Sequence, residues 1–197
     1  MSDVLIIDSG GANLASLRYA LERLGASSEV SSDPVRVAAA ARVLLPGVGA
    51  ARDAMARLRT AGVDTVIRNL RQPLLGICLG MQLLFQSSEE GETDCLGVWK
   101  GRVKRIPGAP ERPVPHMGWN SLAVLQPDPL LRDCTAADYY YFVHGFAADV
   151  GACTLASTDY GAELTAVARR DNFWGVQFHP ERSAQAGARL LRNFLEL

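Results

Sequence analysis

A cysteine framed by two glycines is the feature of the sequence that most directly indicates chemistry. It is Cys78, in the segment GICLG at 76–80, which follows a β-rich apolar run and precedes a helix-like one. A Gly-x-nucleophile-x-Gly turn between strand and helix is typical of a nucleophile elbow. The N-terminus of the following helix favours the thiolate. The pattern predicts a nucleophilic cysteine, and a small buried core cysteine is the alternative interpretation.

A thiolate nucleophile needs a base, and the chain has three histidines. His179 directly follows a strand-like run, and Glu181 stands two residues later, so this carboxylate can hold the imidazole in one tautomer. Catalytic side chains of α/β proteins lie beyond the carboxyl ends of strands. His144 ends another strand-like run and is a rival base, whereas His116 follows a proline-rich loop. We predict a triad of Cys78, His179 and Glu181, against the alternative of a surface turn with an ion pair.

An acyl-enzyme also needs backbone N–H groups that stabilise an oxyanion. The N–H of Leu79, directly after the nucleophile, is one natural donor. The segment PGVG at 46–49 follows another strand-like run, and its glycines allow the backbone to turn an N–H inward. We predict an oxyanion hole built by Leu79, Val48 and Gly49. An ordinary turn is the alternative for PGVG.

The elements that must position these residues alternate along the first half of the chain. Strand-like runs occupy 4–8, 28–32, 43–45 and 74–78, and helix-like runs occupy 14–24, 35–41, 51–70 with an interruption, and 79–86. This alternation predicts a parallel sheet covered by helices on both faces.

After residue 91 the pattern changes to strands with short connections. They are expected at 98–106, 121–125, 139–143, 153–158, 165–168 and 174–178, before a last helix at 186–195. We predict that they extend the sheet in antiparallel fashion. The segment 107–115 carries four prolines and is expected to be a loop.

The length and charge exclude several classes of protein. The 197 residues carry 20 Lys+Arg and 21 Asp+Glu, so the net charge of −1 gives no field that would attract a nucleic acid. The longest apolar stretch, 74–85, is shorter than the about 20 residues that a membrane span needs. We predict a single domain, 1–197, that does not interact with a membrane.

The four cysteines lie far apart in the sequence, at Cys78, Cys95, Cys134 and Cys153. Zinc and redox motifs bring two cysteines within a few residues, and no such pair is present, so we expect no metal site. Four cysteines in a chain of this length do not make a secreted disulfide scaffold. We therefore expect free thiols and a cytoplasmic location.

The motifs PGVG, GICLGMQLL and FHPE, in this order, resemble those of the class I glutamine amidotransferases. The resemblance covers nearly the whole chain. It implies a flavodoxin-like, mostly parallel sheet flanked by helices, with an antiparallel strand extension. It also implies a Cys-His-Glu triad at Cys78, His179 and Glu181 that hydrolyses glutamine through a γ-glutamyl thioester and hands the ammonia to a synthase. The family needs no metal and no organic cofactor for this chemistry.

Two further motifs, PHMGWN at 115–120 and YYYFVHGF at 139–146, resemble the branch of this family that forms the glutaminase subunits of imidazole glycerol phosphate synthases. That branch acts in histidine biosynthesis. The resemblance implies a heterodimer with a (β/α)8-barrel cyclase subunit, which makes imidazole glycerol phosphate and an aminoimidazole carboxamide ribotide from the ammonia. It also implies low activity alone and a rise when the partner binds its ribonucleotide.

The resemblance also assigns roles to single residues. Substrate-binding positions are implied at Gln82, Glu90, Gly47, Gly145 and Phe146. Partner-facing positions are implied at Asn13, Met117, Trp119, Asn120 and Arg182. The alternative for Gln82 and Glu90 is a polar position on a helix surface. The alternative for Trp119 is a position in the core.

Three departures from the family pattern bear on partner contact and regulation, and none of them changes the triad. The first loop reads DSGGAN at 8–13 without the usual aromatic residue, Gly145 replaces a hydroxyl residue, and HPER replaces HPEK. The alternative functions are a glutaminase for another synthase, such as one making guanylate, anthranilate or pyridoxal phosphate, a stand-alone cysteine hydrolase of related fold, and a binding module without catalysis.

Overall fold

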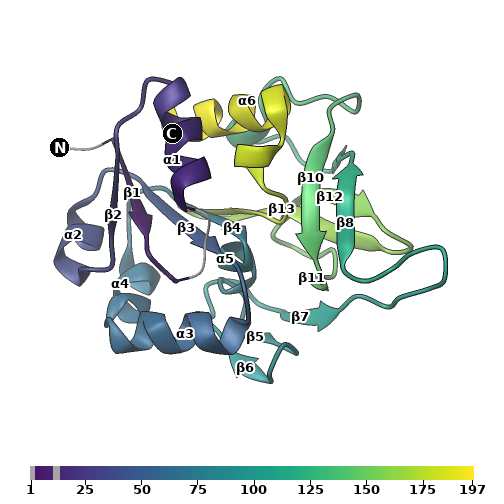
Figure 1. Ribbon diagram of the computed structural model, residues 1–197, viewed down its shortest axis with the longest axis horizontal. Coiled ribbons are helices and arrows are strands. Elements are labelled where there is room, and N and C mark those ends of the chain that lie inside the picture. Colours follow the sequence, from purple (N-terminus) through teal and green to yellow (C-terminus); the bar gives the residue numbers. More distant parts are fainter. Residues whose placement is uncertain (1–2, 11–13) are drawn as a thin grey trace.

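An eight-stranded sheet forms the centre of the computed structural model, which describes residues 3–10 and 14–197 (Figure 1). Asn13 lies outside the described residues. In spatial order the parallel strands are β2 (Ser28–Ser31), β1 (Val4–Ile7), β3 (Val43–Gly47), β4 (Leu74–Cys78) and β14 (Phe173–Val176). The antiparallel strands β13 (Glu163–Arg170), β12 (Thr154–Asp159) and β9 (Ala123–Val124) continue it. The predicted mostly parallel sheet with an antiparallel extension is confirmed.

Helices cover both faces of this sheet. One face carries α1 (Leu14–Arg23) and α6 (Ala184–Leu195), and the other carries α2 (Pro34–Ala39), α3 (Ala51–Thr60), α4 (Val63–Asn69) and α5 (Leu79–Gln82) (Figure 1). The side chains of β1 alternate between the two cores: Val4 and Ile6 pack with the first group, Leu5 and Ile7 with the second. Strands buried on both faces are apolar throughout, which explains the runs in the sequence.

Two smaller sheets stand beside the main one. In one, β8 (His116–Asn120) pairs antiparallel with β10 (Tyr140–His144). The other contains β11 (Phe146–Ala148), β7 (Arg102–Arg105), β5 (Ser87–Ser88) and β6 (Thr93–Asp94). The prediction that 98–106 and 139–143 extend the main sheet is therefore wrong, and β8 was not predicted. Single turns of 3-10 helix, η1 (Pro129–Leu131) and η2 (Pro180–Arg182), complete the described elements.

One helical prediction was too long. The expected helix 79–86 ends at Gln82 because backbone N–H groups of Gln86, Leu96 and Trp99 then bond into a folded loop. The interruption expected within 51–70 is confirmed: α3 and α4 are separated by a turn at Gly62, which has a φ of 69°. Among residues 3–10 and 14–197, no helix is long and apolar enough to cross a membrane.

The start of α5 lies in direct contact with the neighbouring strands through glycines. A Cβ on Gly80 would lie 1.7 Å from the carbonyl oxygen of Leu45 in β3, and one on Gly76 would lie 2.8 Å from the carbonyl oxygen of Gly80. Because backbone rather than flexible side chains fills this space, any side chain at these positions forces α5 away from the sheet. The glycines of GICLG are therefore required by packing.

We expect Gly80→Ala to destabilise the fold by about 3 kcal/mol or to prevent folding, because its methyl group would overlap the Leu45 carbonyl. Gly151→Ala is the matched control, since its Cβ would meet nothing within 4 Å, and we expect a change within about 0.5 kcal/mol. Urea unfolding of both variants measures the difference. Equal stability of the two variants would contradict the packing argument.

Candidate active site

The structure places Cys78 at the junction of β4 and α5, in the conformation of a nucleophile elbow. Its backbone has a φ of 54° and a ψ of −114°, an uncommon region for a residue with a side chain. α5 begins at the next residue, Leu79, and the thiol is largely buried. Strained backbone of this kind persists where the surrounding packing enforces it, and here the glycine contacts of α5 do so.

His179 and Glu181 follow β14 and face each other. The Nδ1 atom of His179 lies 2.8 Å from the Oε1 atom of Glu181, and both side chains are mostly buried. The backbone N–H of His179 donates to the Tyr141 carbonyl at 2.9 Å, and the Ser183 hydroxyl donates to the His179 carbonyl at 2.6 Å. The other ring nitrogen, Nε2, is buried and has no hydrogen-bond partner among the described residues. The ring is thus held at Nδ1, and Nε2 remains available to exchange a proton.

The neighbours of His179 favour its protonated form. Burial alone lowers the pKa of this imidazole, but interactions with Cys78 and Glu181 together raise the pKa to about 10. A ring that carries its proton at neutral pH stabilises a thiolate beside it. The three residues therefore combine a nucleophile, an acid–base group and a carboxylate that orients it.

A cavity of about 310 Å³ joins most of the predicted site residues. Those that line it are Val48, Gly49, Cys78, Leu79, Gln82, Glu90, Gly145, Phe146 and His179. Two predicted residues, Gly47 and Glu181, lie instead on a smaller adjoining cavity of about 140 Å³, which Arg182 also lines. Segments from all parts of the chain therefore meet at the carboxyl ends of β3, β4 and β14, where ligands bind in open α/β sheets.

Backbone N–H groups are available on this cavity wall. The N–H groups of Val48 and Gly49 have no hydrogen-bond partner among the described residues. Gly49 has a φ of 85°, a conformation that disfavours side chains, so the turn requires glycine here. The N–H of Leu79 is the first of α5 and has no acceptor within that helix. These three donors can stabilise a developing oxyanion.

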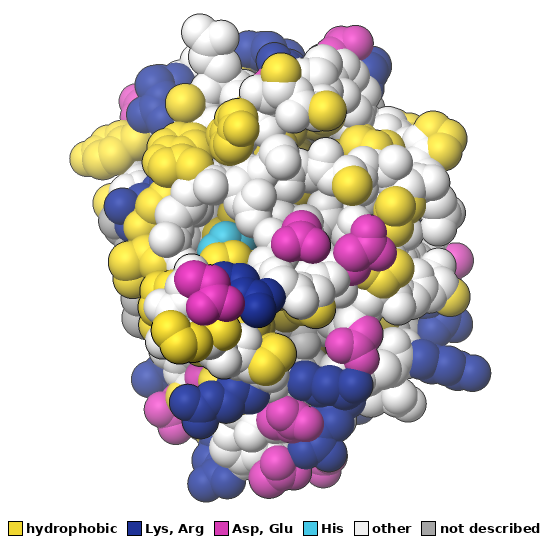
Figure 2. Space-filling model, turned by 90° about the vertical axis from the view of Figure 1, so that its right-hand side faces the viewer, with side chains coloured by type: hydrophobic (Ala, Val, Ile, Leu, Met, Phe, Trp, Pro, Cys, Tyr) yellow, Lys and Arg dark blue, Asp and Glu magenta, His cyan; other side chains and the backbone are white. Residues whose placement is uncertain are grey.

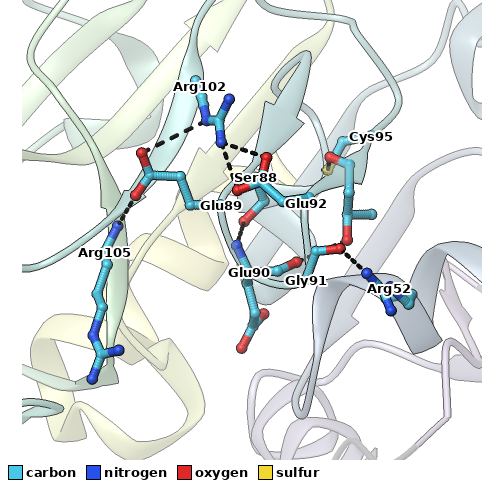
Figure 3. Close-up of polar contacts among 10 residues, drawn as sticks. Arg52, Ser88, Glu89, Glu90, Gly91, Glu92, Cys95, Arg102 and Arg105 are labelled. Carbon is cyan, nitrogen blue, oxygen red and sulfur yellow. Dashed lines mark hydrogen bonds and ion pairs between the residues drawn. The ribbon is translucent and has the colours of Figure 1, made fainter.

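Glu90 ties the loop after β5 to the start of α3. Its Oε2 atom accepts from the N–H of Ala51 at 2.8 Å, two residues after Gly49. Figure 3 shows this carboxylate directed away from Arg102, which pairs with the flanking Glu89 and Glu92 instead. The carboxylate of Glu90 therefore remains on the cavity wall while its neighbours fix the loop.

Two groups that contact Cys78 were not predicted from the sequence. The Gln177 side-chain N–H donates to the Cys78 sulfur at 3.8 Å, and the Cys78 thiol donates to the Val143 carbonyl at the same distance. Gln177 is buried. Its neighbours Val176 and Phe178 pack into the core that α6 covers, and Gln177 is not part of that core. A lone amide in an apolar strand was the available signal.

The other two histidines bond to each other, which bears on His144 as a rival base. His144 Nδ1 lies 2.9 Å from the Phe146 carbonyl, which can only accept, so Nδ1 carries the hydrogen. His144 Nε2 then accepts from His116 Nδ1 at 3.1 Å. Burial lowers the pKa of each ring to about 4. Both nitrogens of His144 are occupied, so neither is left to accept a proton from the thiol.

Those predicted partner-facing residues that the structure describes lie on or beside the β8–β10 sheet. Met117 and Trp119 are 63% and 53% exposed, and the Arg182 guanidinium lies over the Tyr141 ring at 4.5 Å. Figure 2 shows this side of the molecule, where hydrophobic side chains gather above a hollow that holds a histidine. The amide of Asn120 differs, since it donates to the Asp159 carbonyl at 2.8 Å and is used within the chain.

Comparison with known proteins identifies the family. The model of the family described as glutamine amidotransferase class-I matches residues 5–197. The chain belongs to the class I glutamine amidotransferases. This amidotransferase is 54% identical over 197 residues to the imidazole glycerol phosphate synthase subunit HisH of Xanthomonas euvesicatoria, with 100% of this chain and 98% of that protein covered. It is 51% identical, with the same coverage, to the subunit of that name from Xylella fastidiosa strain Temecula1.

Solved structures show the same fold. A crystal structure titled as a glutamine amidotransferase has a TM-score of 0.75 and 22% identity to this amidotransferase, covering 98% of this chain and 97% of the other. A putative GMP synthase component from Thermoplasma acidophilum also has a TM-score of 0.75, at 19% identity, covering 98% and 92%. At this identity the likeness concerns the fold, and it includes the parallel sheet with its antiparallel extension.

The neutral pair of His116 and His144 makes stability depend on pH. Their pKa of about 4 in the folded chain lies below the ordinary 6.5, so between these values the unfolded chain binds more protons. The free energy of unfolding should therefore fall as the pH falls from 6 to 4.5, by up to about 1.4 kcal/mol per pH unit for each proton. Urea unfolding at several pH values, compared with the double variant His116→Gln/His144→Gln, isolates this contribution. Equal pH slopes would contradict it.

Proposed function

We propose that this amidotransferase is the glutaminase subunit of an imidazole glycerol phosphate synthase and that the whole chain forms one glutaminase domain. The observation that carries the proposal is the meeting at one cavity of Cys78, Nε2 of His179 and backbone N–H groups, the latter two without hydrogen-bond partners among the described residues. The relatives that carry this name along their full length support the choice of synthase. The substrate is L-glutamine and the products are glutamate and ammonia.

The first half-reaction forms a thioester. Cys78 has passed its proton to His179, and the thiolate attacks the carboxamide carbon, forming a C–S bond while an electron pair moves onto oxygen. The N–H groups of Leu79, Val48 and Gly49 stabilise this oxyanion. When the intermediate collapses, the C–N bond breaks and Nε2 of His179 donates its proton to the leaving nitrogen. Ammonia departs and a γ-glutamyl thioester remains.

The second half-reaction restores the enzyme. His179, now neutral, accepts a proton from water at Nε2, and the oxygen attacks the thioester carbon. Collapse breaks the C–S bond, returns the thiolate and releases glutamate, whose carboxyl proton goes to solvent. Glu181 remains ionised and holds Nδ1 throughout, as in other triads. Residues and water account for every proton and electron pair, so the proposed reaction needs no cofactor.

Gln82 and Glu90 are suited to hold the amino-acid end of glutamine. Both N–H groups of the Gln82 amide are used within the chain, by the Phe146 carbonyl at 2.8 Å and by Gln177 Oε1 at 2.9 Å. Its Oε1 atom is left as the acceptor for an α-ammonium group, with the Glu90 carboxylate on the same cavity. Gly145 and Phe146 contribute backbone to the walls around the substrate, whereas Gly47 lines the adjoining cavity.

The smaller cavity is the proposed exit for ammonia. It shares Val48, Val143 and His179 with the larger one and extends to Arg182, and Leu17 and Ile77 add apolar walls. A small neutral molecule released at His179 can enter this cavity directly, because His179 lines both cavities. Its far end is the side on which we propose that the (β/α)8-barrel cyclase subunit binds, in contact with Met117, Trp119 and Arg182.

We expect Cys78→Ala to reduce glutamate release by at least about 10³-fold, since the nucleophile is lost. Release should be low for the chain alone and should rise when both the ribonucleotide and its cyclase are added. Cys153→Ser, outside the cavity, is the matched control and should retain activity. The Cys78→Ala complex should still make imidazole glycerol phosphate from added ammonium salt. Absence of glutamate from the wild-type complex would refute the proposed function.

We expect Trp119→Ala to weaken binding of the cyclase subunit by about tenfold or more, because exposed aromatic side chains are frequent anchors of interfaces. Val35→Ala on α2 is the control, since it removes an exposed apolar side chain on the opposite side of the molecule (Figure 1). Titration of labelled cyclase subunit gives both dissociation constants. Unchanged binding in Trp119→Ala would place the interface elsewhere.

A further inference from the structure

Two buried glutamines connect the nucleophile to a backbone carbonyl on the other side of the cavity. Gln177 Nε2 donates to the Cys78 sulfur at 3.8 Å, and Gln177 Oε1 accepts from Gln82 Nε2 at 2.9 Å. Gln82 Nε2 also donates to the Phe146 carbonyl at 2.8 Å. Both glutamine side chains are almost fully buried, so no water competes freely for these bonds.

The direction of this chain of hydrogen bonds is fixed at its far end. A carbonyl oxygen only accepts, so the Phe146 carbonyl requires the NH₂ group, not the oxygen, of Gln82 to face it. The second hydrogen of that NH₂ group then meets Gln177, which must present its oxygen. Gln177 is left with its own NH₂ group toward Cys78. The same carbonyl also accepts from His144 Nδ1, so each of its two lone pairs has a donor.

We propose that Gln177 stabilises the thiolate of Cys78 by a hydrogen bond whose direction is imposed by the Phe146 carbonyl through Gln82. The inference deepens the proposed glutaminase function, on which its catalytic meaning rests. The charged sulfur gains more than the neutral thiol from an N–H donor, because hydrogen bonds to ionised acceptors are the stronger ones. The Val143 carbonyl acts in the opposite sense, since it accepts a hydrogen that only the thiol has.

The other groups that face the sulfur are few. His179, after β14, interacts with it directly, and Glu181 acts through that ring. His144 at the end of β10 and Glu90 after β5 line the same cavity. His144 is kept neutral by burial at neutral pH, and Glu90 is held by the N–H of Ala51. Gln177 is therefore the neutral donor that adds to the charge of His179.

The test is the pH dependence of Cys78 alkylation by iodoacetamide in the full chain, followed at peptide level by mass spectrometry. In Gln177→Leu the donor is absent, and we expect the midpoint of the profile to move up by about one pH unit, so that the rate at pH values below the wild-type midpoint falls about tenfold. Gln177→Glu retains an acceptor for Gln82 but places a negative charge beside the sulfur, so its rate should fall further. The pH profile of kcat/KM for glutamine, measured in the cyclase complex, should shift in the same direction.

Controls separate this effect from a general disturbance of the fold. Gln126→Leu removes an exposed amide that bonds to the Thr154 carbonyl and should leave the Cys78 profile unchanged. Cys153 lies outside the cavity and provides a second profile within each sample, which should be the same in every variant. Circular dichroism and thermal unfolding establish that each variant is folded before alkylation.

If Gln177→Leu does not fold, Gln82→Leu gives the second measurement. It removes the group that orients Gln177, and we expect the Cys78 rate at pH values below the wild-type midpoint to fall about threefold. A wild-type profile in the folded Gln177→Leu variant, or in Gln82→Leu where that variant alone folds, would overturn the proposal. Alkylation requires no glutamine turnover. A chain that shows the predicted shifts but releases no glutamate would refute the proposed function and leave the role of Gln177 intact.

Discussion

The contact of α5 with the end of β3 is the constraint on which the rest of the site depends. Gly80 brings the helix backbone against the Leu45 carbonyl, and the chain can then pass from β4 into α5 only through an uncommon backbone conformation at Cys78. The same contact sets the first N–H of α5 beside Val48 and Gly49, which follow β3. One close approach of backbone to backbone thus aligns the nucleophile with the groups that would stabilise its intermediate.

Burial acts on all three histidines, and their partners decide the outcome. His116 and His144 face each other and a carbonyl, and they stay neutral. His179 faces a thiol and a carboxylate, and its pKa rises in spite of burial. The neighbours Cys78 and Glu181 therefore distinguish the acid–base residue from two structural histidines. The position of Glu181 in the sequence therefore identifies the histidine with the raised pKa, which the number of histidines alone does not.

The parts of the fold with strong local signals were predictable from the sequence. β4 was predicted with its observed bounds, Leu74–Cys78, because a β-rich run is closed by the glycine-framed turn. The strand character of 139–143 was also predicted, but not its partner. Strand pairing depends on distant segments, here β8, whose Gly118 and preceding prolines obscure the alternation of side chains.

The site was predictable only where a residue type and its neighbours in sequence carry the chemistry. Cys78, and His179 with Glu181, are of this kind. Gln177 is not, since its meaning comes from Gln82, 95 positions away in the sequence. The hydrogen bond from the Asn120 amide to the Asp159 carbonyl, 39 positions away, is likewise invisible in the sequence.

Tyr141 of strand β10 contacts both the buried His179 segment and the outer surface. The carbonyl of Tyr141 accepts from the backbone N–H of His179, and the Tyr141 N–H donates to the Ser183 hydroxyl, which in turn donates to the His179 carbonyl. The ring of the same tyrosine lies outside, between Arg182 and Trp119. A force applied to that ring is therefore transmitted to the peptide unit that anchors His179. The alignment of the imidazole is, in mechanical terms, a property of the outer surface as much as of the buried cavity.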